Sequence, residues 1–226
     1  MINDVLDFIY PRYCFGCRNV LLSDEKKLCL TCRLNLPRTR FGGRATNPMF
    51  RFLRSQHAIQ FASASFFFEK NGCTQQVLHA LKYHHQPQLG ILMGTLMAQE
   101  LEGIRKYDEV TWIPVPIHPQ KRRIRGYNQS ELLARGLCRE LGGKVLGSAL
   151  NCMAQSQSQT HKHRSERWTS NQSRFGIEHA TDLIGQQVII VDDVFTTGAT
   201  ISGLLNVMSE LELDSLGCVT FGYTIY

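Results

Sequence analysis

The sequence lacks the features that mark a membrane-spanning or secreted protein. No apolar run in its 226 residues approaches the roughly 20 residues needed to cross a bilayer. Residues 1–7 are acidic and amphipathic, without the basic leader, long apolar stretch or small-residue cleavage site of a secretory signal. We therefore expect a cytoplasmic protein.

Internal repeats are also absent. The chain is 43% hydrophobic and 19% charged, which is ordinary globular material and long enough for one sizeable core. Its formal net charge of +6 agrees with phosphate-bearing partners but does not identify them. Net charge indicates electrostatic attraction and gives no information on the fold.

Four of the eight cysteines form two C-x2-C pairs, Cys14 with Cys17 and Cys29 with Cys32, with eleven residues between the pairs. Each pair can present two thiolates from a tight turn, and the spacer lets both turns face one tetrahedral zinc ion. Because cytoplasmic thiols stay reduced, metal binding is favoured over disulfides. A segment this short and polar cannot fold by burial alone, so we predict a zinc-binding module over residues 1–40 that is stabilised by its metal.

Two alternatives stay open for these four cysteines, namely redox chemistry of a C-x2-C pair and thiols without any ligand. The remaining four cysteines are isolated in the sequence. We interpret Cys138 and Cys218 as small core residues, and we expect no chemistry at Cys73 or Cys152.

Apolar periodicity predicts alternating strands and helices after an exposed basic linker at residues 38–54. The expected strands are residues 58–69, 110–115, 188–191 and 218–224. The expected helices are residues 75–83, 89–101 and 130–141, and a further one that begins near residue 200. Alternation of this kind indicates an α/β fold with a parallel sheet flanked by helices.

Residues 188–200 join a buried strand, two carboxylates and a phosphate-binding turn within thirteen residues. Four consecutive β-branched apolar residues predict a strand covered on both faces, so Asp192 and Asp193 lie at its carboxyl end, where open α/β sheets bind ligands. The alternative is a plain surface turn with Asp as an ordinary turn residue. The turn leads into a helix whose first N–H groups can face a phosphate, and it consists of Thr196, Thr197, Gly198, Ala199 and Thr200.

This segment resembles the phosphoribosyl pyrophosphate (PRPP) signature of type I phosphoribosyltransferases, in which an apolar strand runs into Asp-Asp and then a Thr-Thr-Gly-x-Thr loop. The resemblance covers the whole motif. It implies that Asp192 and Asp193 hold the ribose 2- and 3-hydroxyls of PRPP, and that residues 196–200 hold its 5-phosphate.

A second constellation lies between the predicted strand at 110–115 and the next helix. Residues 113–119 read I-P-V-P-I-H-P and residues 121–130 read K-R-R-I-R-G-Y-N-Q-S. A strand that opens into a basic, Gly-containing turn before a helix has the shape of an anion site, although charge alone equally fits a solvated loop. Together with Leu81-Lys82-Tyr83 and the four-cysteine module, these segments resemble the competence protein F (ComF) family. That resemblance implies a type I phosphoribosyltransferase domain over residues 41–226.

Residues 155–175 have almost no apolar content, and a long polar loop of this kind is commonly a lid over a site. Type I phosphoribosyltransferases close a flexible loop on PRPP, and this run resembles the ComF-family version. Ser170 stands where that family usually places Asn, and Asn171 follows it. Arg164 and Arg167 lie in the same run, and they are either lid residues that bind diphosphate or exposed charges without a role.

The chemistry of PRPP, which the resemblance implies, assigns roles to the other charged residues. Negative charge grows on the diphosphate as it leaves, and cations and N–H donors must stabilise it. We expect Arg125 and backbone N–H groups near Gly126 to bind the diphosphate, with Lys82, Arg164 and Arg167 completing the site. Mg²⁺ is expected to bridge diphosphate and ribose oxygens.

Nothing in the sequence specifies the acceptor, so three functions stay open. The first is a phosphoribosyltransferase of the ComF type that acts in DNA uptake or nucleotide salvage. The second is a non-catalytic competence factor that binds single-stranded DNA and takes PRPP as an effector, although no aromatic stacking platform is evident. The third is an adaptor whose zinc module recruits a protein partner, such as a DNA-uptake protein.

Overall fold

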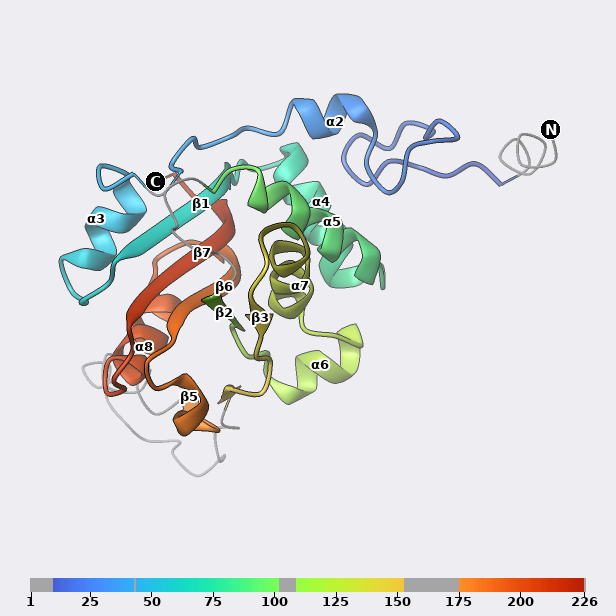
Figure 1. The fold of residues 1–226 in the computed structure, drawn as a ribbon. Helices are drawn as coiled ribbons and strands as arrows, with labels where there is room; N and C mark the ends of the chain where they lie inside the picture. Colours follow the sequence, from blue (N-terminus) through green and yellow to red (C-terminus); the bar gives the residue numbers. More distant parts are fainter. Residues whose placement is uncertain (1–9, 43, 102–108, 153–174, 226) are drawn as a thin grey trace, which may run out of the picture.

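A computed structural model of the chain describes residues 10–42, 44–101, 109–152 and 175–225. Its centre is a sheet in the order β1-β7-β6-β2-β3, and every neighbouring pair is parallel (Figure 1). The predicted α/β class with a parallel sheet is confirmed. The strands of this sheet are β1 (Phe61–Phe67), β2 (Val110–Pro114), β3 (Lys144–Val145), β6 (Gln187–Phe195) and β7 (Ser215–Tyr223).

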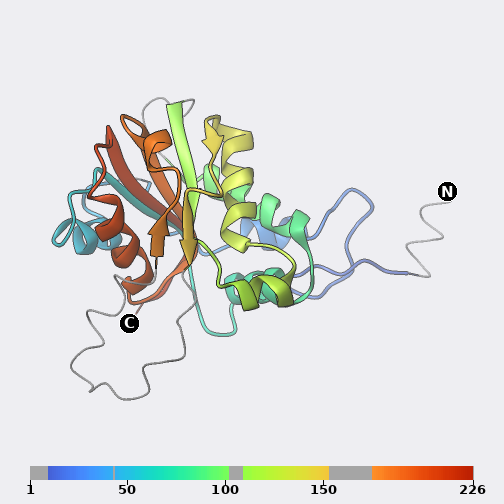
Figure 2. The ribbon, with the colours of Figure 1, turned by 90° about the horizontal axis from the view of Figure 1, so that it is seen from below.

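Side chains of the central strand β6 alternate between two hydrophobic layers. Ile189 and Val191 pack in the layer that contains α4 (Cys73–Tyr83), α5 (Pro87–Ala98) and α7 (Gln129–Leu141). Val188 and Ile190 pack in the opposite layer, with α3 (Pro48–Arg54) and α8 (Ala199–Met208). Figure 2 shows helices on both sides of the sheet. Burial on both faces is the physical reason for four apolar residues in a row.

Helices α5 and α7 approach each other closely because glycines lie at their contact. A Cβ on Gly94 would collide with the carbonyl oxygen of Leu133, and a Cβ on Gly136 would collide with that of Ile91. This packing holds α7 against the sheet, and the first turn of α7 reaches the carboxyl ends of the strands.

The prediction that residues 38–54 form an exposed linker is wrong, because the segment contains helix α3. The N-cap residue Asn47 accepts a hydrogen bond at 2.7 Å from the Phe50 N–H and starts helix α3. Met49, Phe50 and Leu53 are buried in the layer that also contains residues of β1, whereas Arg51 and Arg54 stay exposed. The exposed arginines of this segment therefore lie on a short helix whose apolar face is buried.

Several elements were absent from the sequence prediction. The basic turn after β2 contains helix α6 (Pro119–Arg125), and the strand expected at 188–191 continues to Phe195. A two-stranded antiparallel pair joins β4 (Leu150–Cys152) to β5 (Phe175–Ile177). A 3-10 helix, η4 (Ala180–Leu183), precedes β6. Of the expected lid, residues 155–174 lie outside the described residues.

The cysteine-rich segment shares its core with the sheet. Buried Leu21, Leu28 and three of the four paired cysteines belong to the same hydrophobic cluster as Val77 and Leu81 of α4. The segment includes the short helix α2 (Leu30–Leu34) and extends beyond α4 in Figure 1. Within the described ranges, no helix is both long enough and apolar enough to cross a membrane.

Candidate functional site

Asp192 and Asp193 lie near the carboxyl end of β6, as predicted, but inside the strand and not beyond it. Asp192 pairs in register with Thr220 of β7. Its Oδ1 accepts hydrogen bonds from the Ser130 hydroxyl at 3.0 Å and from the Asp193 N–H at 2.8 Å. The first turn of α7 therefore holds Asp192 in place.

The two carboxylates differ in their electrostatic surroundings. Burial and the neighbouring charge of Asp193 raise the pKa of Asp192 to about 7, while the hydrogen bonds and the charge of Lys82 act in the opposite direction. Asp193 has a direct cationic partner, because Lys82 Nζ lies 2.6 Å from its Oδ2. Asp192 therefore titrates near neutral pH beside a carboxylate that is paired with a lysine.

Lys82 reaches this position from the last turn of α4, and Tyr127 holds that turn. The Tyr127 hydroxyl donates to the Leu81 carbonyl at 2.6 Å and accepts from the Gln86 N–H at 3.0 Å. Lys82, from the Leu81-Lys82-Tyr83 segment, is thus brought to Asp192 and Asp193, which we call the acid pair. Its expected contact with a diphosphate stays a prediction.

Residues 125–130 connect three parts of the fold to the site. The Asn128 side chain donates to the Val115 carbonyl at the end of β2, at 2.9 Å, and caps α7 by accepting from the Ser130 N–H at 3.1 Å. Sequence reasoning missed the supporting roles of Tyr127, Asn128 and Ser130. The signal was present, because all three belong to the R-G-Y-N-Q-S motif.

Arg125 lies close to the same region, with its guanidinium carbon 5.7 Å from the Tyr83 ring centre and Nη1 donating to Gln129 Oε1 at 2.9 Å. Gly126 ends α6 in a left-handed conformation, with φ of 80°. Its N–H donates to the Arg122 carbonyl at 2.8 Å, so it closes the helix and does not point to an open site. The Arg125 side chain, and not the Gly126 N–H, is the donor available here.

The turn after β6 has the geometry of a phosphate cradle. Gly198, with φ of 77°, is the N-cap of α8 and provides no side-chain cap to that helix. Thr196, Thr197 and Thr200 are exposed. The turn therefore presents hydroxyls and the amino end of a ten-residue helix at the same end of the sheet as the acid pair.

A hollow of about 440 Å³ lies at the opposite end of the sheet. Val110 and Gln187, the first residues of β2 and β6, line it together with Lys144 and Asp214. Parallel sheets bind ligands at the carboxyl ends of their strands, so we place the candidate site at the acid pair and not at this hollow.

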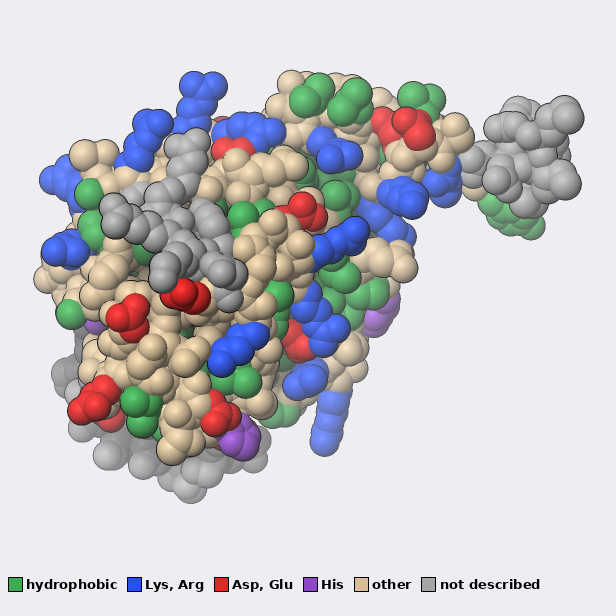
Figure 3. All heavy atoms as spheres, in the orientation of Figure 1, with side chains coloured by type: hydrophobic (Ala, Val, Ile, Leu, Met, Phe, Trp, Pro, Cys, Tyr) green, Lys and Arg blue, Asp and Glu red, His purple; other side chains and the backbone are tan. Residues whose placement is uncertain are grey.

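Basic side chains gather over α6, where Lys121, Arg122 and Arg123 are exposed. Ile124 beside them is 71% exposed. Figure 3 shows Lys and Arg side chains along the side of the molecule that carries α6. No residue of this helix is buried, and the exposed side chains of Lys121, Arg122 and Arg123 can meet an anionic partner.

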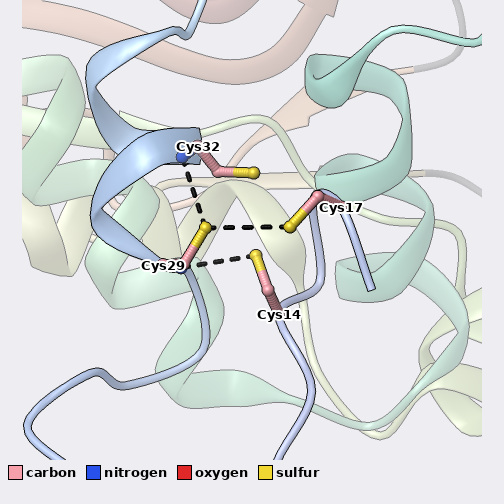
Figure 4. A group of neighbouring side chains, drawn as sticks. All are labelled: Cys14, Cys17, Cys29 and Cys32. Atoms are coloured by element: carbon pink, nitrogen blue, oxygen red, sulfur yellow. Dashed lines mark hydrogen bonds between the residues drawn. The ribbon is translucent and has the colours of Figure 1, made fainter. Parts of the chain in front are cut away.

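The paired cysteines come together as predicted. The sulfur atoms of Cys14, Cys17, Cys29 and Cys32 lie within 4.8 Å of one another (Figure 4). Cys17 and Cys29 are separated by 3.7 Å between sulfurs, and Cys32 lies on the first turns of α2. Four sulfurs at this separation form a group that could hold one metal ion.

Backbone donors favour the thiolate at Cys14, whereas burial raises the pKa of Cys29 and of Cys32. Burial opposes ionisation of Cys14, but hydrogen bonds from the backbone N–H groups of Cys29, Cys17 and Gly16 outweigh it and lower the Cys14 pKa to about 7. The Cys14 sulfur accepts from Gly16 and from Cys29 at 3.3 Å in each case. N–H groups aimed at a buried sulfur are typical of zinc knuckles, so the residues present fit a structural zinc ion.

Two predicted site residues cannot be placed. Arg164 and Arg167 lie outside the described residues, as does Asn171. The structure does bring Lys82, Asp192 and Asp193 together, and Arg125 lies over the ring of Tyr83, the residue after Lys82.

Comparisons with known proteins give relatives of modest identity. No protein-family model matches the chain. It is 26% identical over 138 residues to the DNA utilization protein YhgH of Salmonella typhimurium, covering 58% of this chain and 59% of that protein. It is 30% identical over 109 residues to competence protein ComFC of Streptococcus pneumoniae, covering 48% of this chain and 46% of that protein.

Competence protein F of Haemophilus influenzae is 27% identical to the chain over 105 residues, which are 46% of each. The chain thus spans about half the length of the curated relatives it matches. The resemblance found in the sequence is confirmed, because proteins with the competence protein F and ComFC names are among these relatives.

Proposed function

We propose that the chain binds PRPP with Mg²⁺ at the carboxyl ends of its central strands and transfers the phosphoribosyl group to an acceptor. One observation carries this proposal. Asp192 and Asp193 are held between Ser130 and Lys82, directly ahead of the Gly198 turn and α8. Carboxylates, a cation and a helix N-terminus are the groups that a ribose bearing two phosphate ends requires.

Ribose and its 5-phosphate would use the strand and the turn. The carboxylates of Asp192 and Asp193 accept hydrogen bonds from the two ribose hydroxyls, each worth about 1.5–3 kcal/mol. The first N–H groups of α8 and the exposed hydroxyls of Thr196, Thr197 and Thr200 meet the 5-phosphate.

The diphosphate would be met by the cations on the α4 side. Lys82 leaves Asp193 and pairs with a diphosphate oxygen, and the Arg125 guanidinium, which lies over the Tyr83 ring, provides further planar donors. A carboxylate of the acid pair would help to hold a Mg²⁺ ion that arrives with PRPP, and the ion would supply further charge neutralisation on the diphosphate. Arg164 and Arg167 stay predicted contributors to the same charge.

Transfer then requires one bond to break and one to form. The bond from ribose C1 to the diphosphate breaks with its electron pair going to the diphosphate, and a lone pair of the acceptor forms the new bond to C1. Lys82 and Arg125 stabilise the charge that grows on the leaving group. The names of the relatives, DNA utilization protein and competence protein, lead us to propose that this chemistry serves the uptake or use of DNA.

A second candidate is a non-catalytic factor that binds single-stranded DNA and takes PRPP as an effector. The exposed basic face of α6 favours it, because Lys121, Arg122 and Arg123 can neutralise backbone phosphates. In this case DNA affinity falls steeply with salt, and PRPP is bound but not consumed.

Calorimetry with PRPP and Mg²⁺ tests the binding site. The double variant Asp192→Asn/Asp193→Asn is expected to lose at least about 100-fold in affinity, since two charged acceptors are removed. The matched control is Asp214→Asn, an exposed residue at the far end of the sheet, which should bind as the native chain does. Native affinity in the double variant refutes the assignment of the acid pair.

Diphosphate release separates the two candidates. PRPP is offered with nucleobases, amines or single-stranded DNA, and acceptor-dependent release supports transfer. PRPP binding without release in any mixture, together with DNA binding that Lys121→Gln/Arg122→Gln/Arg123→Gln abolishes, supports the effector role instead.

A further inference from the structure

Cys73 lies against the four-cysteine cluster although the sequence gives it no partner. A Cβ on Gly16 would lie 2.8 Å from the sulfur of Cys32 and 2.8 Å from the sulfur of Cys73, so both sulfurs face the space that this glycine leaves open. A fifth thiol therefore borders a group of four metal-ligand sulfurs.

Cys17 differs from the other three members of the cluster. It is exposed, whereas Cys14, Cys29 and Cys32 are buried. Water and thiol-reactive reagents therefore reach the Cys17 sulfur first, and its bond to a metal ion is the one most open to exchange.

We propose that Cys73 is a reserve ligand of the metal site that replaces Cys17 when Cys17 leaves the metal. The zinc–sulfur bond to Cys17 breaks and a zinc–sulfur bond to Cys73 forms, while the Cys73 proton passes to the departing Cys17 sulfur. Charge and protons balance without an oxidant or another reactant. Zinc tolerates the exchange because it has no redox chemistry and no geometric preference from its d-electrons.

The exchange has a mechanical consequence, because Cys73 is the first residue of α4. The same helix carries Lys82 in its last turn, and Lys82 pairs with Asp193. With Cys73 bound, a single eleven-residue helix links the metal to the acid pair. With Cys17 bound, no metal–ligand bond joins α4 to the cysteine segment.

Metal content and cobalt spectra of the full chain test the proposal. Cys17→Ala is expected to retain about one metal ion per chain, and its cobalt form to keep the thiolate-to-cobalt absorption intensity of four sulfurs. Cys17→Ala/Cys73→Ala should lose that intensity and most of the metal. The matched control Cys17→Ala/Cys152→Ala should behave as Cys17→Ala does, and Cys29→Ala should lose its metal with Cys73 intact.

Two results overturn the proposal. One is a Cys17→Ala chain that loses metal as completely as Cys29→Ala. The other is a Cys17→Ala/Cys73→Ala chain that holds metal as well as Cys17→Ala.

Alkylation of the native zinc-loaded chain gives a reading that does not depend on how the variants fold. N-ethylmaleimide should modify Cys17 first, and the zinc should stay bound. Cys73 should then become protected from modification. Mass spectrometry measures the modification of each cysteine. Release of zinc in step with modification of Cys17 contradicts the exchange.

Discussion

Lys82 Nζ lies 2.6 Å from Asp193 Oδ2 and joins the last turn of α4 to β6. The two side chains are 26% and 18% exposed, so solvent screens the pair and its contribution to folding is about 1 kcal/mol or less. The ion pair matters for ligand binding because of where it places the Lys82 ammonium. The ammonium is held beside the carboxylates before any ligand arrives, and Tyr127 fixes the turn from which it extends.

Replacing Lys82 by Met keeps the apolar stem and removes the charge. Affinity for PRPP with Mg²⁺ should fall about 10- to 100-fold, the effect of one charge-assisted contact, and folding should change little. Calorimetry measures the first and urea unfolding the second. Lys70→Met, at an exposed position, is the control, and unchanged PRPP affinity in Lys82→Met means that Lys82 does not contact the ligand.

The stability of the protein should depend on pH through Asp192. Its pKa is raised from 3.8 to about 7, mainly by burial and then by the charge of Asp193. Between these values the folded chain holds a proton that the unfolded chain has released, so the contribution of Asp192 to the free energy of unfolding falls as pH rises from about 4 to about 7.

Asp192→Asn removes this titration, so its free energy of unfolding should vary less over the same pH window. Urea unfolding at several pH values measures the difference, and exposed Asp214→Asn should keep the native slope. Identical pH slopes in the native and Asp192→Asn chains would show that the Asp192 pKa is not raised.

Ser130→Ala should weaken the hold on Asp192 from α7. The lost hydrogen bond lowers the Asp192 pKa in the native chain, so its removal should raise that pKa further and cost about 1 kcal/mol of folding free energy. Carboxyl-carbon NMR titration measures the pKa. Ser209→Ala, whose hydroxyl donates to the Asn206 carbonyl at the surface, should leave it where it was.

Gly198→Ala should damage the phosphate cradle through two separable effects. A left-handed backbone costs an alanine about 1 kcal/mol, and the added Cβ would also lie 2.8 Å from the Phe195 ring and 2.9 Å from the Phe52 ring. Gly185→Ala is the matched control, because its φ is 67° and nothing lies within 4 Å of the added carbon.

Thermal unfolding should therefore show a larger loss of folding free energy in Gly198→Ala than in Gly185→Ala. The difference should be about 1–3 kcal/mol, because only the alanine at 198 is overpacked. Affinity for ribose 5-phosphate should fall only in that variant. Equal losses of stability in both variants would mean that backbone strain alone acts at Gly198.

Sequence alone predicted the parts of the site that are contiguous in the chain. A run of β-branched residues followed by Asp192 and Asp193 predicts a strand and its carboxyl end, because chain direction sets which end carries the acids. The two C-x2-C pairs were equally readable, since each lies within one turn of chain. The segment 38–54 misled the prediction, because exposed arginines hid the short apolar face of α3.

Only the tertiary structure decided which distant residues complete these local motifs. Ser130 reaches Asp192 and Lys82 reaches Asp193 because packing on the sheet brings the first turn of α7 and the last turn of α4 to the carboxyl end of β6. Cys73 meets Cys32 because Gly16 leaves room between them. Periodicity shows which face of a helix is buried but not which helix lies beside it or where along its length they touch, and packing of complete side chains settles both.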